Sequence, residues 1–161
     1  MFIFTDYFPD IGHEDLRINI DSAFESNSEL IDYIERLTSS PYSDGDNWDG
    51  FLDSITDLTW LSTVKKIHIV HESIPNIKEI HKYLDILNFA DVWWEINPER
   101  EKIRKLIVCD PENYCNQDDI EFNVYFRNED KEFVANSLEN FSKNYRNRLY
   151  YDKDGIISIE I

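Results

Sequence analysis

The stretch from Tyr42 to Leu61, YSDGDNWDGFLDSITDLTWL, decides the fold because it joins a tight turn directly to a short amphipathic helix. Pro41 and Gly45 mark the turn, and Asp46 or Asn47 can cap the helix by accepting a backbone N–H hydrogen bond. At about 100° per residue, the apolar side chains that follow share one arc. They are Trp48, Phe51, Leu52, Ile55 and Leu58. This arc predicts a helix that packs against a core.

The opposite face of this helix is acidic. Asp49, Asp53 and Asp57 follow one another at a spacing of four residues, and Asp46 falls in the same angular sector. Like charges at this spacing repel each other, and only the acids near the start of the helix gain from the positive end of its dipole. The stripe is therefore either a solvated face or a docking surface.

The pattern G-x-N-W-D-x-x-x-D, followed by a leucine and a tryptophan, resembles the signature helix of the barstar family, whose members are intracellular inhibitors of secreted ribonucleases. The residues that carry the resemblance are Gly45, Asn47, Trp48, Asp49, Asp53, Leu58 and Trp60. The segment from Ile18 to Leu37 agrees with the family's order of a short strand, a serine-capped start and an amphipathic helix. The resemblance covers about Leu16 to Asp110 and implies a barstar-like fold.

In that family, the helix and the loop before it plug the ribonuclease active site, with carboxylates where substrate phosphates would lie. Carried over to this sequence, the resemblance implies partner contacts by Asp49 and Asp53, and a further contact acid at Asp91 or Glu95 on a later helix. The complete set of predicted partner-binding residues is Tyr42, Asp44, Asp46, Asn47, Asp49, Leu52, Asp53, Asp57, Asp91 and Glu95.

Several positions depart from the family pattern. Leu52 stands where the family often has an aromatic residue, and Gly50 stands where alanine is common, which costs up to about 1 kcal/mol of helix propensity. Ser43 and Asp44 replace the residues nearest the glycine of the turn, so only Tyr42 supplies an aromatic ring close by. We therefore expect an enzyme partner other than the family's familiar one.

The charge of the chain restricts its partners. Its 161 residues include 33 acidic and 16 basic side chains, which gives a formal net charge of −17. This charge repels nucleic acid and attracts a basic protein, although solubility alone also explains it. Two cysteines are too few for a disulfide framework, and the N-terminal sequence lacks a secretion signal, so we expect a cytoplasmic protein. No apolar run approaches the roughly 18 residues of a membrane span, so no membrane partner is expected.

The remaining periodicities predict an α/β fold. Strands are expected at Leu16–Ile20, Lys65–Glu72 and Lys105–Cys109, with a short edge strand within residues 1–15. Ser26 and Glu29 form a capping box for a helix that runs to Leu37. One long helix or two short helices are expected from Asn76 to about Ile96. Right-handed crossovers then give a small three-stranded parallel sheet packed with helices.

Residues 111–161 predict a C-terminal extension made of a strand, a helix and a hairpin. The strand is expected at Ile120–Arg127, and the hairpin strands at Leu149–Tyr151 and Ile156–Ile161. The helix stripe comprises Phe133, Val134, Leu138, Phe141 and Tyr145. An extension this short buries too little apolar area to fold alone. We therefore divide the chain into a barstar-like domain at 1–110 and an extension at 111–161, which is expected to pack on that domain or to extend its sheet.

We find no pattern that predicts catalysis, a metal site or a cofactor. His68 and His71 are three residues apart on a strand and must point to opposite faces, and the DGDNWDG segment fails the calcium-loop pattern. We expect an immunity-type inhibitor of a basic ribonuclease toxin. The alternative is an acidic protein-binding module on the same fold without nuclease-inhibiting activity. An enzyme with a site at Asp49 and Asp53 ranks last, because exposed carboxylates lack the buried setting of acid–base catalysis.

Overall fold

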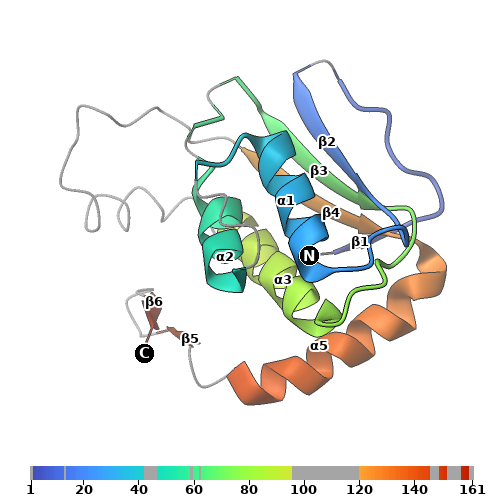
Figure 1. Ribbon diagram of the computed structural model, residues 1–161, viewed down its shortest axis with the longest axis vertical. Coiled ribbons are helices and arrows are strands. Elements are labelled where there is room, and N and C mark those ends of the chain that lie inside the picture. The colour runs from blue at the N-terminus through green and yellow to red at the C-terminus, as the bar shows by residue number, and fades with distance from the viewer. Residues whose placement is uncertain are drawn as a thin grey trace.

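A parallel sheet forms the centre of the computed structural model (Figure 1). The structure describes residues 2–12, 14–41, 47–58, 60–61, 63–95, 120–145, 149–151 and 157–159. The sheet has the order β1-β4-β3-β2, and every neighbouring pair is parallel. Its strands are β1 (Ile3–Phe4), β2 (Asp15–Ile20), β3 (Lys66–His71) and β4 (Glu121–Phe126). The α/β class predicted from the sequence is confirmed.

The helices of the described residues pack with this sheet. They are α1 (Asn27–Thr38), α2 (Trp48–Asp57), α3 (Ile80–Glu95) and α5 (Lys131–Tyr145), and a short 3-10 helix, η2 (Asn128–Asp130), precedes the last one. The predicted cap of α1 is present, since the Ser26 hydroxyl accepts the Glu29 N–H at 3.2 Å. The Glu29 carboxylate in turn accepts the N–H of Glu25 at 3.3 Å, so the start of α1 is held from both sides.

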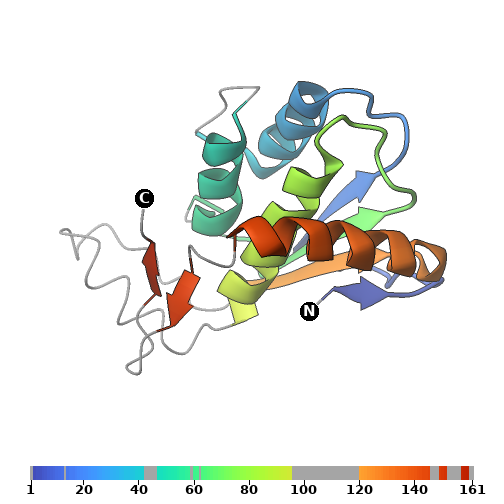
Figure 2. The ribbon, with the colours of Figure 1, turned by 90° about the horizontal axis from the view of Figure 1, so that it is seen from below.

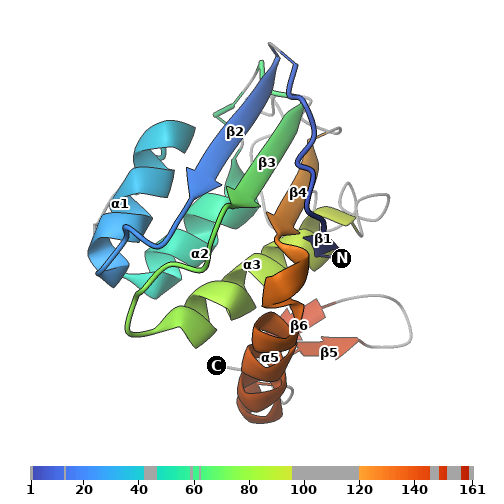
Figure 3. The same ribbon diagram turned by 90° about the vertical axis from the view of Figure 1, so that its right-hand side faces the viewer.

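The strand order explains why α1, α2 and α3 lie on one side of the sheet (Figures 2 and 3). The chain passes from β2 to β3 to β4 in one direction across the sheet, and right-handed crossovers of one direction place their helices on one face. The passage from β1 to β2 runs in the opposite direction. The same handedness therefore places residues 5–12 on the other face (Figure 3).

The core lies between the sheet and this helical layer. Side chains alternate between the two faces along each strand, and the apolar ones point to the helices. The apolar stripes of the helices pack against them. The fully buried apolar side chains include Ile18, Ile20, Ile67, Ile69, Val124 and Phe126 from the sheet, and Leu30, Ile34, Phe51, Ile55, Tyr83, Leu84 and Leu87 from the helices. The periodicities read from the sequence therefore mark the correct faces of these elements.

The sheet differs from the expected three strands in its number and in one member. The edge strand β1 adds a fourth strand by pairing with β4, with Ile3 opposite Tyr125. The strand beside β3 is β4, which comes from the predicted C-terminal extension, whereas the expected strand Lys105–Cys109 lies outside the described residues. The division of the chain at residue 110 stays a prediction.

The rest of the extension follows its predicted order. The helix α5 packs on α3, and β5 (Leu149–Tyr151) pairs antiparallel with β6 (Ile157–Ile159). One member of the predicted helix stripe is wrong: Phe133 is 44% exposed, while Val134 is buried. None of the helices in the described ranges combines the length and the apolar character that a bilayer span requires.

Candidate partner-binding face

The helix α2 begins and ends with local signals that its sequence supplies. Asn47 is the N-cap: its side-chain oxygen accepts the Asp49 N–H at 3.0 Å, and its carbonyl accepts the Phe51 N–H at 2.9 Å. Leu58 ends the helix in the left-handed conformation, with φ of 47°. Phe51 and Ile55 face the core between these ends, so the register of α2 is fixed by burial.

The acids of α2 project away from that core. Asp49 and Asp53 are exposed, and Asp57 is half-buried. Partial burial raises the pKa of Asp53, and the negative charges of Asp49 and Asp57 raise it further. In the part of the chain that the structure describes, no cationic side chain forms an ion pair with Asp49 or Asp53. The face therefore presents exposed carboxylates whose negative charges repel each other.

Hydrogen bonds from three indole groups surround α2. Trp48 Nε1 donates to Glu79 Oε2 at 2.9 Å, at the start of the helix. Trp94 Nε1, from α3, donates to the carbonyl of Ile55 at 2.9 Å, near the end of the helix. After the helix, Trp60 Nε1 donates to the Thr38 carbonyl at 2.7 Å, at the end of α1. These directed contacts join α2 to both neighbouring helices.

A polar contact also fixes the side of α2 that faces α1. The Ser54 hydroxyl lies 2.8 Å from the Ser40 hydroxyl and 3.3 Å from Glu35 Oε1. Both Ser54 and Glu35 are 2% exposed, so this contact is shielded from water. A hydrogen bond in such a setting constrains position more strongly than one at the surface. The exposed acids are therefore carried by a helix that is held on its buried side.

Only some of the predicted partner-binding residues lie together in the structure. Asn47, Leu52 and the acids of α2 lie together on one short helix, with Leu52 half-buried beside Asp53. Asp91 is only 4% exposed, and this burial disfavours a direct contact with a partner. The remaining predicted residues are Tyr42, Asp44 and Asp46, which lie outside the described residues, and Glu95, which ends α3 but whose side chain is not described.

Glu79 was not in the predicted set, although it contacts the first residue of α2. Its only sequence signal is the spacing to Lys82, whose Nζ lies 2.6 Å from Glu79 Oε1. That spacing indicates a surface ion pair but does not predict a hydrogen bond to Trp48, which is distant in the sequence. Pairing between Trp48 and Glu79 depends on how the helices pack, so only the structure reveals it.

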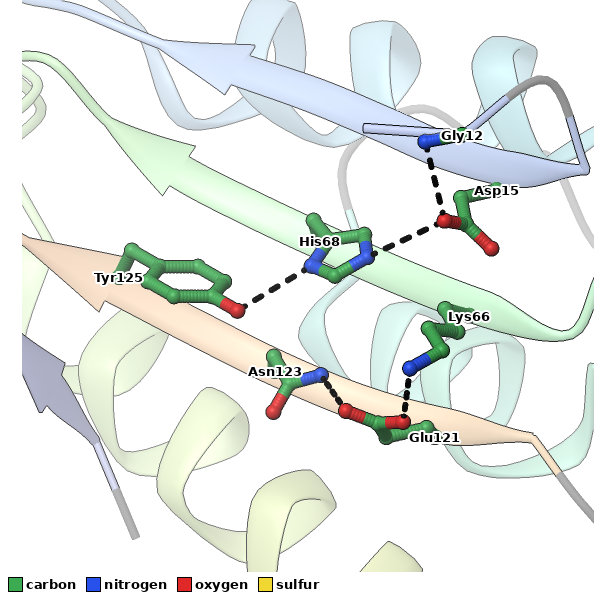
Figure 4. A network of polar contacts seen from close by, with 7 residues as sticks. All are labelled: Gly12, Asp15, Lys66, His68, Glu121, Asn123 and Tyr125. Carbon is green, nitrogen blue, oxygen red and sulfur yellow. Dashed lines mark hydrogen bonds and ion pairs between the residues drawn. The ribbon is translucent and has the colours of Figure 1, made fainter. Parts of the chain in front are cut away.

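A second group of polar side chains lies on the face of the sheet away from these helices (Figure 4). Lys66 Nζ lies 2.6 Å from Glu121 Oε2, and Asn123 Nδ2 donates to Glu121 Oε1 at 2.9 Å. The hydrogen bond from Lys66 lowers the pKa of Glu121, and the bond from Asn123 lowers it further. These contacts connect β3 and β4 on this face of the sheet, so they have a structural role.

His68 occupies the middle of this polar face. Its Nδ1 lies 3.3 Å from the Tyr125 hydroxyl, and its Nε2 lies 3.9 Å from Asp15 Oδ2, which also accepts the Gly12 N–H at 3.2 Å (Figure 4). Burial lowers the pKa of His68, and the charge of Asp15 partly opposes this. As predicted, His71 points to the other face, toward Tyr83 of α3. Among the described residues, no group of three or more His, Cys, Asp or Glu side chains could hold a metal ion.

Comparison with known proteins agrees with this geometry. The family model described as Barstar (barnase inhibitor) matches residues 16–126, a range that includes β2, α1, α2, β3, α3 and β4. No curated protein and no solved structure matches the chain. The family match confirms the resemblance carried by the turn, the capping asparagine and the aspartates of α2, and it covers more than half of the sequence. The chain belongs to the barstar family.

Proposed function

We propose that this protein is an intracellular inhibitor of the immunity type, which blocks the active site of a basic ribonuclease toxin with α2 and the loop before it. The observation that carries the proposal is the pair Asp49 and Asp53. Both are exposed on a helix fixed by buried contacts, and neither has a cationic partner among the described residues. Such a face is complementary to a cationic cleft.

The chemistry of a ribonuclease supplies that cleft. An enzyme that binds RNA phosphates presents Arg, Lys or His side chains, and carboxylates accept charge-assisted hydrogen bonds from them. Carboxylates on a helix offer no phosphodiester bond to cleave, so the occupied site stays blocked. The net charge of −17 favours this encounter, because opposite charge accelerates association.

In this proposal, the described contact residues are Asn47, Asp49, Leu52, Asp53 and Asp57 on α2. The loop residues Tyr42, Asp44 and Asp46 belong to the same proposed surface, and Glu95 remains the candidate acid on α3. We propose no catalytic activity for this surface, in keeping with a family of inhibitors.

The proposal is tested by RNA cleavage with barnase and other basic microbial ribonucleases, each with and without a stoichiometric amount of this protein. Protection that weakens at high salt and is lost in Asp53→Ala supports the proposal. The matched control is Glu132→Ala, which removes one negative charge from an exposed position of α5 and should retain full protection. Protection that is indifferent to Asp53 argues against α2 as the contact.

The cytoplasmic location is part of the same proposal and needs its own test. A ribonuclease expressed without a secretion signal is toxic to the cell that makes it, and co-expression of this protein should restore growth. The Asp53→Ala variant should fail to do so at equal abundance. Absence of protection from every ribonuclease, in cells and in solution, would favour an acidic binding module on the same fold.

A further inference from the structure

We propose that Glu79 is a positioning residue for the partner-binding face, a role that rests on the proposed function above. It acts through the indole of Trp48, the first residue of α2, and makes no contact with the partner itself. The inference starts from the place of Glu79 in the fold, directly before Ile80, where α3 begins. From there its carboxylate reaches the starts of two other helices.

The contacts of Glu79 join three helix starts. Its Oε2 accepts hydrogen bonds from Trp48 Nε1 at 2.9 Å and from Asn27 Nδ2 at 2.7 Å, and Asn27 is the first residue of α1. Asn27 Oδ1 accepts the backbone N–H of Glu79 at 3.3 Å. Glu79 Oε1 lies 2.6 Å from Lys82 Nζ. One carboxylate therefore links the beginnings of α1, α2 and α3.

The charge of Glu79 makes these links effective. The hydrogen bonds from Lys82 and Trp48 lower the pKa of Glu79, so the carboxylate is ionised at neutral pH. An ionised acceptor forms shorter and stronger hydrogen bonds than a neutral one. Lys82 also offsets the charge of Glu79, which reduces its own contribution to long-range attraction of a cationic partner.

The start of α2 needs this support because apolar burial fixes it less firmly than the middle of the helix. Phe51 and Ile55 are at most 1% exposed, whereas Trp48 is only half-buried. Asp49 follows Trp48 directly and precedes Asp53 by one turn. The orientation of the first turn therefore decides where the Asp49 carboxylate lies relative to that of Asp53. A displaced carboxylate loses the geometry that a charged hydrogen bond requires.

The first test needs no partner. Hydrogen exchange of the Asp49 and Phe51 amides reports opening of the first turn of α2, since both N–H groups bond to Asn47. Glu79→Ala should accelerate this exchange roughly tenfold, as expected for loss of a hydrogen bond to a charged group, and leave exchange in β3 unchanged. Glu79→Gln keeps an acceptor oxygen but loses the charge, so it should restore part of the protection. Equal exchange in wild type and Glu79→Ala would overturn the proposal.

The second test measures binding to a ribonuclease that the wild-type protein inhibits. Glu79→Ala should raise the dissociation rate roughly tenfold with little change in the association rate, because the one charge it removes is a small part of the net charge of −17 and the main loss is in positioning. Trp48→Phe keeps the charge and an aromatic ring but loses the N–H donor, and it should act similarly. The double variant should be no weaker than the stronger single variant, since each change removes the same hydrogen bond between Trp48 and Glu79.

Additive losses in this cycle would overturn the proposal by assigning separate roles to the two residues. Glu132→Ala is the control for removal of one negative charge and should bind as the wild type does. If the wild type inhibits no ribonuclease, the proposed function fails, while the exchange experiment still decides whether Glu79 fixes α2. Unchanged binding by Glu79→Ala against an inhibited ribonuclease would remove the positioning role and leave the inhibitor function intact.

Discussion

The Nε2 atom of His71 lies 3.0 Å from the hydroxyl oxygen of Tyr83 in the interior of the protein. The other ring nitrogen, Nδ1, lies 3.0 Å from the carbonyl oxygen of Tyr125. A carbonyl can only accept, so Nδ1 carries the proton and Tyr83 donates to Nε2. The neutral ring also stacks on Phe126, with centroids 4.1 Å apart. Both nitrogens of a buried imidazole are therefore satisfied without a charge.

This arrangement predicts that acid destabilises the protein through His71. Burial lowers its pKa from 6.5 to about 3, so the unfolded chain takes up a proton at a higher pH than the folded one. The stability is complete above pH 6.5 and falls as the pH decreases toward 3, by at most about 3 kcal/mol between pH 6.5 and 4. Urea unfolding at several pH values measures the slope. His71→Leu should be less stable at pH 7 yet show a shallower acid slope.

The carboxyl group of Asp85 should make the free energy of unfolding depend on pH with the opposite sign. Burial raises its pKa to about 6, and no hydrogen bond or ion pair of Asp85 is present in the described structure. Since the folded protein binds this proton more tightly than the unfolded chain, the contribution to stability declines as the pH rises from about 4 through 6. Asp85→Asn should raise the free energy of unfolding at pH 8 by about 1 kcal/mol after solvent screening. A loss of stability in this variant would show that the carboxylate has a favourable role.

The two central acids of α2 should respond differently to loss of their charge. Asp53→Asn should stabilise the free protein by about 0.2–0.5 kcal/mol, because it relieves repulsion from Asp49 and Asp57, which together with burial raise the pKa of Asp53. Asp49→Asn should gain less, since Asp49 lies in the first turn and benefits from the helix dipole. Thermal unfolding of both variants measures the difference.

Both changes should nevertheless weaken inhibition. We expect Asp49→Ala and Asp53→Ala each to reduce binding to the ribonuclease by about 2 kcal/mol or more, the general scale of hot-spot residues that the barnase–barstar complex helped to set. Calorimetric titration at two salt concentrations measures this loss. A variant that instead lowers the melting temperature without weakening binding would identify its aspartate as structural. Gain of stability with loss of binding would show that the face is kept repulsive for function.

Two aromatic residues near the N-terminus test whether that segment belongs to the core. Phe2 is 9% exposed and its ring centroid lies 5.0 Å from that of Phe126, whereas Tyr7 is 89% exposed. Phe2→Ala should cost about 3 kcal/mol of unfolding free energy. Tyr7→Ala should change it by less than about 0.5 kcal/mol. Equal, small effects of both substitutions would mean that β1 adds little to the stability of the sheet.

Local chemistry made much of the fold predictable from the sequence. Ser26 and Glu29 mark the start of α1 through bonds between near neighbours, and the alternation around His68 and His71 assigns the two faces of β3. Asp91 lies at helical spacing from Leu84, Leu87 and Trp94 of α3, and the structure buries it with them. The role of Asp91 as a partner contact stays a prediction from the family resemblance, and its burial argues against it.

Contacts between distant segments could not be predicted in the same way. No local sequence pattern predicts that Ile3 pairs with Tyr125 in the sheet. No local pattern predicts the hydrogen bond between Trp48 and Glu79 either. These pairings depend on the order of strands and on the packing of three helices, which are properties of the whole chain. In α5, helical periodicity predicted the buried face to within one residue: Val134 is buried, but its neighbour Phe133 lies just outside the packed face.

The pairing of β1 with β4 has a consequence for biosynthesis. During translation, β1 emerges before every other strand of the sheet, yet its partner residues Tyr125 and Phe126 come last among them. At ordinary rates of elongation, roughly ten seconds pass between the synthesis of Phe2 and Phe4 and the synthesis of β4, against which they pack. The sheet therefore closes only after nearly all of residues 16–126, the range that matches the family model, have been synthesised. During this interval the N-terminal aromatic residues are exposed and available to a chaperone.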